Sequence, residues 1–336
     1  MNGNVGPGLS RFLATELDGA VRVSNVRQVS AGARRRTVVF DAQRQGRSVR
    51  LVATIVPAAI EQIPVEAEAA VRELARKHGV PAPPVVAVCT EDTYLGAPFL
   101  ISEHVDGETV PRKVLRLVHA AGIGDRVAYQ LGQAMAHLHI VDPGAAPDRL
   151  PGEAESDPAA TELAAAERGV RALLADRPVF AAAMRWLEQR VPPPPERKAL
   201  LHTDMRNGNL IVDGDGLRAV LDWEGARRFG DPMRDAAWAA LRMWRFRSDA
   251  AEFGGFGGRE PFVRGYESAG GRFDPDRFRW WKVLCTLGWG VGLAQQAAAY
   301  LDGTVRDIVM AASGRRIPEI EWDLLMQIRP TELTHP

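Results

Sequence analysis

The first third of the chain alternates short apolar runs with polar turns, and this pattern predicts strands. The runs lie at residues 26–29, 37–40, 49–56, 85–88 and 99–105. Residues 9–17 instead repeat apolar side chains near the helical period, and Ile63-Pro64-Val65 opens a second helical pattern that ends at Gly79-Val80-Pro81. The hydrophobic pattern therefore predicts a small sheet accompanied by helices.

Helical spacing dominates the rest of the chain. It is found at residues 127–138, 162–174, 180–191 and 274–301, and residues 142–160, rich in Pro, Gly, Ala and Asp, separate two of these helices as a loop or insertion. Asp231-Pro232 predicts an N-cap followed by a proline at the first helical position. We therefore expect a second, mainly helical part of the chain.

One hairpin interrupts the helical part. Two short apolar runs within residues 210–221 flank an Asp-Gly-Asp-Gly turn. Because a hairpin brings its two ends together, the carboxylates of Asp204 and Asp222 and the amide of Asn209 are expected to converge. An Asp-Asn pair supplies the hard oxygen ligands that suit Mg²⁺. Asp204 is then left to receive a proton from an attacking hydroxyl.

The residues around this hairpin resemble the aminoglycoside phosphotransferase family, small-molecule relatives of the protein kinases. His202-Thr203-Asp204 followed by Asn209 is similar to the family's H-x-D-x-x-x-x-N catalytic loop. Asp222-Trp223-Glu224 stands in the place of the kinase Asp-Phe-Gly, and Gly230-Asp231-Pro232, followed by Asp235, matches the segment beyond it. The sequence of these segments looks most like that of a bacterial branch of the family, which is related to phosphotransferase modules fused to some acyl-CoA dehydrogenases. The resemblance covers residues 30–328 and is most specific over 199–245.

The resemblance implies an α+β, two-lobed, protein-kinase-like fold. Residues 1–106 would form a nucleotide-binding lobe, an antiparallel sheet with one helix, and the hinge would fall at about 101–107. Residues 107–336 would form the larger helical lobe, which carries the catalytic loop and the acceptor site.

The resemblance also implies a reaction, the transfer of the γ-phosphoryl group of ATP or GTP to a hydroxyl of a small molecule. Asp204 would orient the acceptor hydroxyl and accept its proton, while Asn209 and Asp222 would hold Mg²⁺. His202 would brace the loop by hydrogen bonding, and Asp235 would support it from the second lobe.

Nucleotide contacts are expected in two places. A loop of small residues between two strands, with Gly32 and Ala33, can let backbone N–H groups approach phosphates, and three arginines follow directly, at Arg34, Arg35 and Arg36. These arginines could equally form a solvated turn. At the hinge, backbone groups near Glu103 and Val105 would meet the adenine ring.

One position departs from the family. The strand residue that is usually basic and holds the α- and β-phosphates falls at Thr54, which cannot make a charge-assisted phosphate contact. Arg50, on the same side of the strand, or a loop arginine could replace it. Glu68 best matches the helix glutamate that pairs with this cation. The alternative interpretation is a catalytically impaired kinase fold that serves as a nucleotide-binding or scaffold protein.

Composition excludes several other classes of protein. The 336 residues contain 42 Lys and Arg against 42 Asp and Glu, so no general basic field for nucleic acid is expected. Cys89 and Cys285 are too few for a disulfide framework, which favours a reducing cytoplasm, and the first residues lack a signal-peptide pattern. The apolar segment 278–301 is interrupted by polar residues and three glycines, so we expect a buried helix rather than a membrane span.

Other motifs are excluded on specific grounds. The sequence has no G-x-x-x-x-G-K-[ST] and no H-E-x-x-H, and Arg218 stands where an EF-hand loop requires glycine. His137 and His139 are two apart on a predicted helix, point to different sides and are interpreted as structural. The acceptor stays open between sugars, amino alcohols, hydroxyacyl thioesters and macrolides. An aminoglycoside pocket would be acidic, with candidate acids at Glu153, Glu155, Asp157 and Glu162. The oligomeric state is also open.

Overall fold

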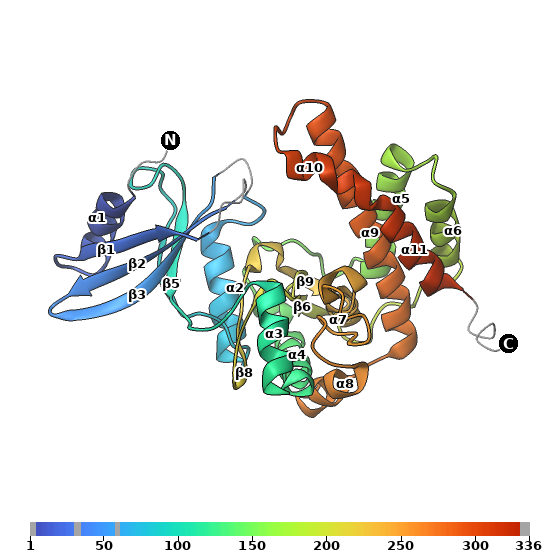
Figure 1. Ribbon diagram of the computed structural model, residues 1–336, viewed down its shortest axis with the longest axis horizontal. Helices are drawn as coiled ribbons and strands as arrows, with labels where there is room; N and C mark the ends of the chain where they lie inside the picture. Colours follow the sequence, from blue (N-terminus) through green and yellow to red (C-terminus); the bar gives the residue numbers. More distant parts are fainter. Residues whose placement is uncertain (1–4, 30–34, 58–60, 330–336) are drawn as a thin grey trace.

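The computed structural model describes residues 5–29, 35–57 and 61–329. Figure 1 shows a sheet on one side of the molecule and a larger group of helices on the other. The predicted division into a sheet part and a helical part is therefore present.

The sheet has five strands, all paired antiparallel, in the order β1-β2-β3-β5-β4. Its strands are β1 (Arg22–Gln28), β2 (Arg36–Arg44), β3 (Arg47–Ile55), β4 (Val85–Cys89) and β5 (Phe99–Glu103). Leu51, Ala53 and Ile55 alternate along β3 and are buried, because this face of the sheet packs against helix α1 (Gly6–Glu16). The opposite face of β3 carries Thr54.

Helix α2 (Val65–Lys77) lies between the sheet and the rest of the molecule (Figure 1). Its apolar residues Ala67, Val71 and Ala75 belong to the hydrophobic cluster of the helical lobe and not to that of the sheet. Val220 N–H also donates to the carbonyl of Pro81, just beyond α2, at 2.8 Å. The hydrophobic cores of the sheet and of the helical lobe therefore adjoin along α2, which contacts β4 and β5 as well.

The helical lobe is built on α9, a helix of 27 residues that buries Trp280 and Trp281 and contacts α5, α6, α7, α10 and α11. Its α-helices are α3 (Pro111–Ala121), α4 (Gly124–His139), α5 (Pro158–Leu173), α6 (Pro178–Glu188), α7 (Pro232–Ala239), α8 (Arg259–Ser268), α9 (Pro275–Leu301), α10 (Ile308–Ser313) and α11 (Ile317–Ile328). Short 3₁₀ turns are η2 (Pro143–Ala145), η3 (Trp223–Gly225), η4 (Arg242–Arg245) and η5 (Gly314–Arg316). Aspartates cap four of the described α-helices, α5, α7, α9 and α10, as Asp231 does for α7.

Two small antiparallel sheets lie between these helices: β6 (Ala199–Leu201) pairs with β9 (Arg227–Gly230), and β7 (Leu210–Asp213) with β8 (Gly216–Val220). The β7–β8 pair is the predicted hairpin. The segment that follows β5 is hydrogen-bonded to this hairpin. The backbones of Glu108 and Val212 exchange two hydrogen bonds, of 2.8 and 3.1 Å. Gly107 has φ 144°, and a side chain there would lie 2.5 Å from Ile211, so glycine is required at this crossing. The hinge is thus anchored to the hairpin.

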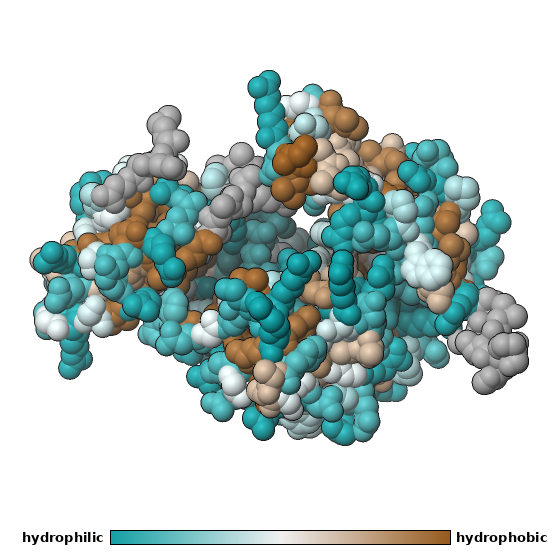
Figure 2. All heavy atoms as spheres, in the orientation of Figure 1, coloured by the Kyte–Doolittle hydropathy of each residue, from teal (hydrophilic) through white to brown (hydrophobic). Residues whose placement is uncertain are grey.

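The surface is mainly hydrophilic (Figure 2). Apolar residues are exposed near the end of α9 and on α10, among them Leu301 and Ile308. Among the helices of the described residues, none combines the length and apolarity that crossing a bilayer requires.

Candidate active site

The loop between β6 and β7 is held by one buried carboxylate. Asp235, in the first turn of α7, accepts the backbone N–H groups of His202 at 2.7 Å and Thr203 at 2.9 Å. Thr203 has φ 70°, a left-handed conformation that is costly for a β-branched residue. The two bonds to Asp235 hold the chain in this turn, so Asp235 shapes the loop that carries Asp204.

His202 joins the loop to the end of β8. Its Nδ1 accepts the N–H of Asp204 at 3.2 Å, and its Nε2 lies 3.0 Å from the carbonyl of Leu221. A backbone N–H can only donate and a carbonyl can only accept, so the proton is on Nε2. Complete burial lowers the pKa of His202, which keeps the ring neutral. Both ring nitrogens are used in this brace.

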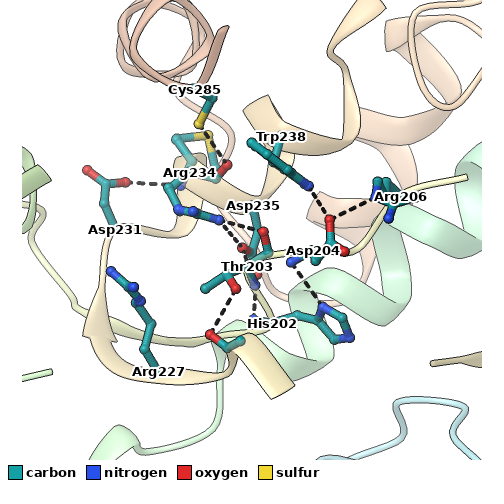
Figure 3. Close-up of polar contacts among 12 residues, drawn as sticks. His202, Thr203, Asp204, Arg206, Arg227, Asp231, Arg234, Asp235, Trp238 and Cys285 are labelled. Atoms are coloured by element: carbon teal, nitrogen blue, oxygen red, sulfur yellow. Dashed lines mark hydrogen bonds and ion pairs between the residues drawn. The ribbon is translucent and has the colours of Figure 1, made fainter. Parts of the chain in front are cut away.

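Asp204 is fixed by three donors, of which Figure 3 shows Arg206 and Trp238. Its Oδ1 accepts from Arg206 Nε at 2.8 Å and from Trp238 Nε1 at 2.7 Å. Its Oδ2 accepts from Asn209 Nδ2 at 2.6 Å. The side chain is 28 % exposed, so the carboxylate is oriented yet open to a ligand.

Arg206 and Trp238 are missing from the residues that the sequence singles out. Arg206 follows Asp204 by two positions, and Trp238 lies three positions after Asp235 on α7. Both therefore lie within residues 199–245, where the family resemblance is most specific. Arg206 also stacks over Trp244, with the guanidinium carbon 4.1 Å from the ring centre. The signal that could have found Arg206 is a cation next to the expected base.

Asn209 and Asp222 meet at the open end of the hairpin. Leu221 N–H donates to the carbonyl of Asn209 at 2.8 Å, which places Asp222 next to Asn209. The amide nitrogen of Asn209 donates to both Asp204 oxygens, backbone and side chain, so its amide oxygen is the atom left for a ligand. Asp222 has φ 65°, and its side chain is 38 % exposed.

This pair fits a magnesium ion. The described residues contain no group of three or more His, Cys, Asp or Glu side chains that could enclose a metal. One carboxylate and one amide oxygen are instead the partial set that Mg²⁺ takes when water and phosphates complete its shell. Burial raises the pKa of Asp222; Arg35 opposes this effect, and the negative charges of Asp204 and Glu68 add to it. A cation bound here would relieve that excess of negative charge.

Arg35 takes the position next to the helix glutamate. Its Nη1 lies 2.9 Å from Glu68 Oε2 and 3.9 Å from Asp222 Oδ1, and its Nε pairs with Glu224. Glu68 on α2 is buried, and Arg35 is only 11 % exposed. Gln62 donates to the other oxygen of Glu224 at 3.1 Å. The cation that Thr54 cannot supply thus reaches Glu68 from the residue before β2.

The other basic candidates lie elsewhere or are not described. Arg50, at 59 % exposure, pairs with Asp41 at 3.3 Å on the sheet, so the structure does not bring it to Glu68. Arg36 Nε donates to Gln28 on β1 at 3.2 Å. Gly32, Ala33 and Arg34 lie outside the described residues.

The hinge offers backbone groups. Glu103 ends β5, and its N–H donates to Pro84 at 3.0 Å, while His104 N–H donates to Arg50 at 3.1 Å. The backbone of Val105 takes no hydrogen bond from any described residue. The backbone groups of Val105 are therefore left for a ligand, as far as the described residues show.

A second layer of side chains supports Asp235 and the loop. His139 bonds both Asp235, at 3.4 Å, and Tyr266, at 2.8 Å, while His137 bonds the carbonyl of Gly79 at 3.2 Å. The two histidines thus have separate protein partners. Burial alone would raise the pKa of Asp235, but the hydrogen bond and charge of His139 and the charge of Arg234 hold it below its usual range.

Two of the four candidate acids before and in α5 have partners in the protein, whereas Glu153 and Glu155 are exposed. Asp157 caps α5, accepting the N–H groups of Ala159 and Ala160. Glu162 pairs with Arg227 at 3.2 Å and with Arg234 at 3.4 Å, and Arg234 in turn donates to the carbonyl of Thr203 at 2.6 Å. Glu162 therefore stabilises the catalytic loop through Arg234.

Known proteins match this chain in sequence. The model of the phosphotransferase enzyme family matches residues 25–281. Acyl-CoA dehydrogenase family member 11 of Gallus gallus is 29 % identical over 169 residues, which cover 48 % of this chain and 21 % of that protein. Acyl-CoA dehydrogenase family member 10 of Mus musculus is 26 % identical over 190 residues, which cover 54 % of this chain and 17 % of that protein. The match thus spans about a fifth of the length of these curated relatives.

Solved structures match nearly the whole chain. An aminoglycoside phosphotransferase-like protein of Ralstonia eutropha has a TM-score of 0.70 at 21 % identity, covering 96 % of this chain and 97 % of its own. An aminoglycoside phosphotransferase in ternary complex with ADP and hygromycin B has a TM-score of 0.64 at 17 % identity. The match covers 96 % of this chain and 100 % of that protein. The macrolide 2'-phosphotransferase of Brachybacterium faecium has a TM-score of 0.60 at 20 % identity, covering 91 % and 97 %.

These likenesses confirm the two-lobed, protein-kinase-like fold that the sequence motifs predict. The family match extends from β1 to α9 and includes the whole catalytic loop. The chain belongs to the phosphotransferase enzyme family.

Proposed function

We propose that this protein is a small-molecule kinase that transfers the γ-phosphoryl group of ATP or GTP, with Mg²⁺, to a hydroxyl of its acceptor. The observation that carries the proposal is the arrangement of Asp204, which is oriented by three donors and lies directly beside the Asn209–Asp222 pair. The relative crystallised with ADP and hygromycin B supports the pairing of a nucleotide with a small acceptor.

In the proposed reaction, Asp204 orients the acceptor hydroxyl and accepts its proton as the oxygen attacks the γ-phosphorus. The bond from that phosphorus to the bridging oxygen breaks, and the nucleoside diphosphate leaves. Asn209 and Asp222 would hold Mg²⁺, which neutralises phosphate charge when bound. His202 transfers no proton; it maintains the position of Asp204 relative to β8.

Arg35 would supply the cation for the α- and β-phosphates. Its ion pair with Glu68 directs it toward Asp222, on the side of the metal pair. An arginine here can make the charge-assisted phosphate contact that Thr54 cannot. The adenine or guanine ring would use the backbone of Val105 and the end of β5 near Glu103. We also infer a cytoplasmic location, which suits the two buried free thiols of Cys89 and Cys285.

The test begins with nucleotide binding. Thermal shift with ATP and with GTP, each with and without Mg²⁺, is expected to show Mg²⁺-dependent stabilisation. A phosphate-transfer assay over sugars, amino alcohols, hydroxyacyl thioesters and macrolides then measures turnover, with Asp204→Asn as the inactive control. Nucleotide binding without transfer to any compound of this panel would favour the nucleotide-binding scaffold instead.

A further inference from the structure

A pocket in the helical lobe has Trp244 in its wall, the ring over which Arg206, a donor to Asp204, is stacked. It has a volume of about 520 Å³ and lies between the start of α3, η4 and the start of α11. Trp244 and Phe246 line it together with four arginines and three acids. Nothing in the proposed function yet uses this pocket.

One side chain separates the pocket from the proposed base. Arg206, which donates to Asp204 at 2.8 Å, stacks on Trp244 of the pocket wall. Trp238, the other donor to that oxygen, lies 5.6 Å from Trp244 between ring centres. A side chain built on Gly208 of the catalytic loop would lie 3.5 Å from Pro111, the residue before Arg112. The pocket wall is therefore linked to Asp204 through Arg206.

The charges lining the pocket leave an excess of cations. Arg242 pairs with Asp323, and Arg316 pairs with Glu319 at 3.4 Å. Arg112 and Arg247 pair with no carboxylate among the residues described, and Asp249 is the one other acid of the lining there. Two uncommitted guanidinium groups thus face one carboxylate.

The backbone is strained at the edge of the pocket. Phe246 and Arg247 have φ of 48° and 80°, so two consecutive non-glycine residues adopt a left-handed conformation, which costs about 1–3 kcal/mol each. Both residues line the pocket, so the fold accepts this cost where the cation of Arg247 borders it.

From this arrangement we infer that the acceptor is a hydroxyl compound that carries an acid group, a carboxylate or a phosphate, which Arg112 and Arg247 bind while its hydroxyl faces Asp204. The inference rests on the proposed phosphoryl transfer. A polycationic aminoglycoside suits the pocket poorly, because its lining carries more cations than acids, and Asp157 and Glu162 already cap α5 and pair with arginines.

The experiment compares compounds of one size and different charge. Glucuronate and glucose phosphate carry the two acid groups, glucose is neutral and glucosamine is cationic. Transfer from ATP with Mg²⁺ and calorimetric binding in the presence of ADP are measured for all four. The variants are Arg112→Gln with Arg247→Gln, and, as a matched control, Arg264→Gln, which removes an exposed arginine paired with Glu260 on α8.

We expect kcat/KM for at least one acid to exceed that for glucose by about 10-fold or more, the size of one charge-assisted contact. The double variant should raise KM for that acid by a similar factor, remove the preference for the acid over glucose, and weaken binding of the acid to ADP-loaded protein. Arg264→Gln should behave as the unmodified protein. Whether glucuronate or glucose phosphate is preferred identifies the acid group.

Equal or faster transfer to glucose or glucosamine would overturn the inference, and so would acid binding that the double variant leaves intact or the absence of acid binding. If no compound receives phosphate, the proposed function fails. The calorimetric measurements then test whether Arg112 and Arg247 bind an acid, because binding to ADP-loaded protein requires no turnover.

Discussion

Arg35 Nη1 lies 2.9 Å from Glu68 Oε2, and this ion pair joins the loop before β2 to helix α2. In the family motif the partner of such a glutamate comes from strand β3, where this chain has Thr54. Arg35 thus places beside Glu68 a cation that Thr54 cannot supply, and we propose that it takes the role of the strand cation. Thr54 alone is therefore no argument against nucleotide binding.

Removal of this cation should weaken nucleotide binding. We expect Arg35→Gln to lower the affinity for Mg²⁺-ATP by about 10-fold or more, because a charge-assisted contact is lost and Glu68 is left buried without it. Calorimetric titration measures the change, and Arg35→Lys should recover part of it. Arg50→Gln, on the same sheet but paired with Asp41, is the matched control. A larger loss with Arg50→Gln would show that Arg50 is the phosphate cation after all.

Asp204 is expected to act in the chemical step and not in nucleotide binding. Asp204→Asn should lower kcat by about 10²–10³ or more, because the acceptor proton loses its receiving group. Asparagine keeps one oxygen for Arg206 and Trp238, although its amide nitrogen then faces Asn209 Nδ2 and that one hydrogen bond is lost; the fold and the affinity for ADP without Mg²⁺ should be unchanged. Steady-state kinetics and calorimetry separate the two effects. Unchanged kcat on a reactive acceptor would exclude Asp204 as the base.

Much of the fold was predictable because its signals are local. The alternation in β3, the turn of the β7–β8 hairpin and the Asp231-Pro232 start of α7 each depend on residues within a short window. The convergence of Asp204 with Asn209 followed from the hairpin geometry. The motif alone placed Asp235, since its bonds to His202 and Thr203 span more than thirty residues.

Other parts of the site depend on contacts that no local pattern records. The sequence does not distinguish Arg35 from the two arginines beside it. In the structure, Arg35 pairs with Glu68, which lies on helix α2, more than thirty residues later in the chain. Arg50 lies on the same face of strand β3 as Thr54, but it forms an ion pair with Asp41 on the neighbouring strand β2. The orienting bond from Trp238 to Asp204 likewise forms only when α7 packs against the loop.

Asp235 should be a major determinant of stability. Asp235→Ala leaves the buried N–H groups of His202 and Thr203 without their acceptor, which should lower the free energy of unfolding by about 3 kcal/mol. Urea unfolding followed by circular dichroism measures this change. Glu260→Gln, which removes an exposed ion pair, should cost less than about 1 kcal/mol. Equal effects of the two substitutions would contradict the role assigned to Asp235.

Glu252 gives stability a defined dependence on pH. Burial would raise its pKa, but Arg259, at 2.8 and 3.0 Å, and Lys282, at 2.6 Å, lower it from 4.5 to about 2. A lowered pKa means that the stabilisation is complete above pH 4.5 and is lost as the pH falls toward 2. The shift corresponds to about 3 kcal/mol.

The variant Glu252→Gln tests this linkage. It should be less stable than the unmodified protein near neutral pH, and the difference in free energy of unfolding should shrink as the pH falls below about 4.5. Chemical denaturation at a series of pH values measures the difference. A gap that stays constant between neutral and acidic pH would show that Glu252 is not held ionised by Arg259 and Lys282.

The packing of α2 determines how the molecule can come apart. The chain leaves the first hydrophobic cluster after β3, enters the second with Ala67 and Val71, and returns to the first with β4 and β5. No single cut yields two self-sufficient halves, because either fragment would present an apolar surface that belongs to the other. The lobes should consequently melt together as one cooperative unit and resist production as separate polypeptides.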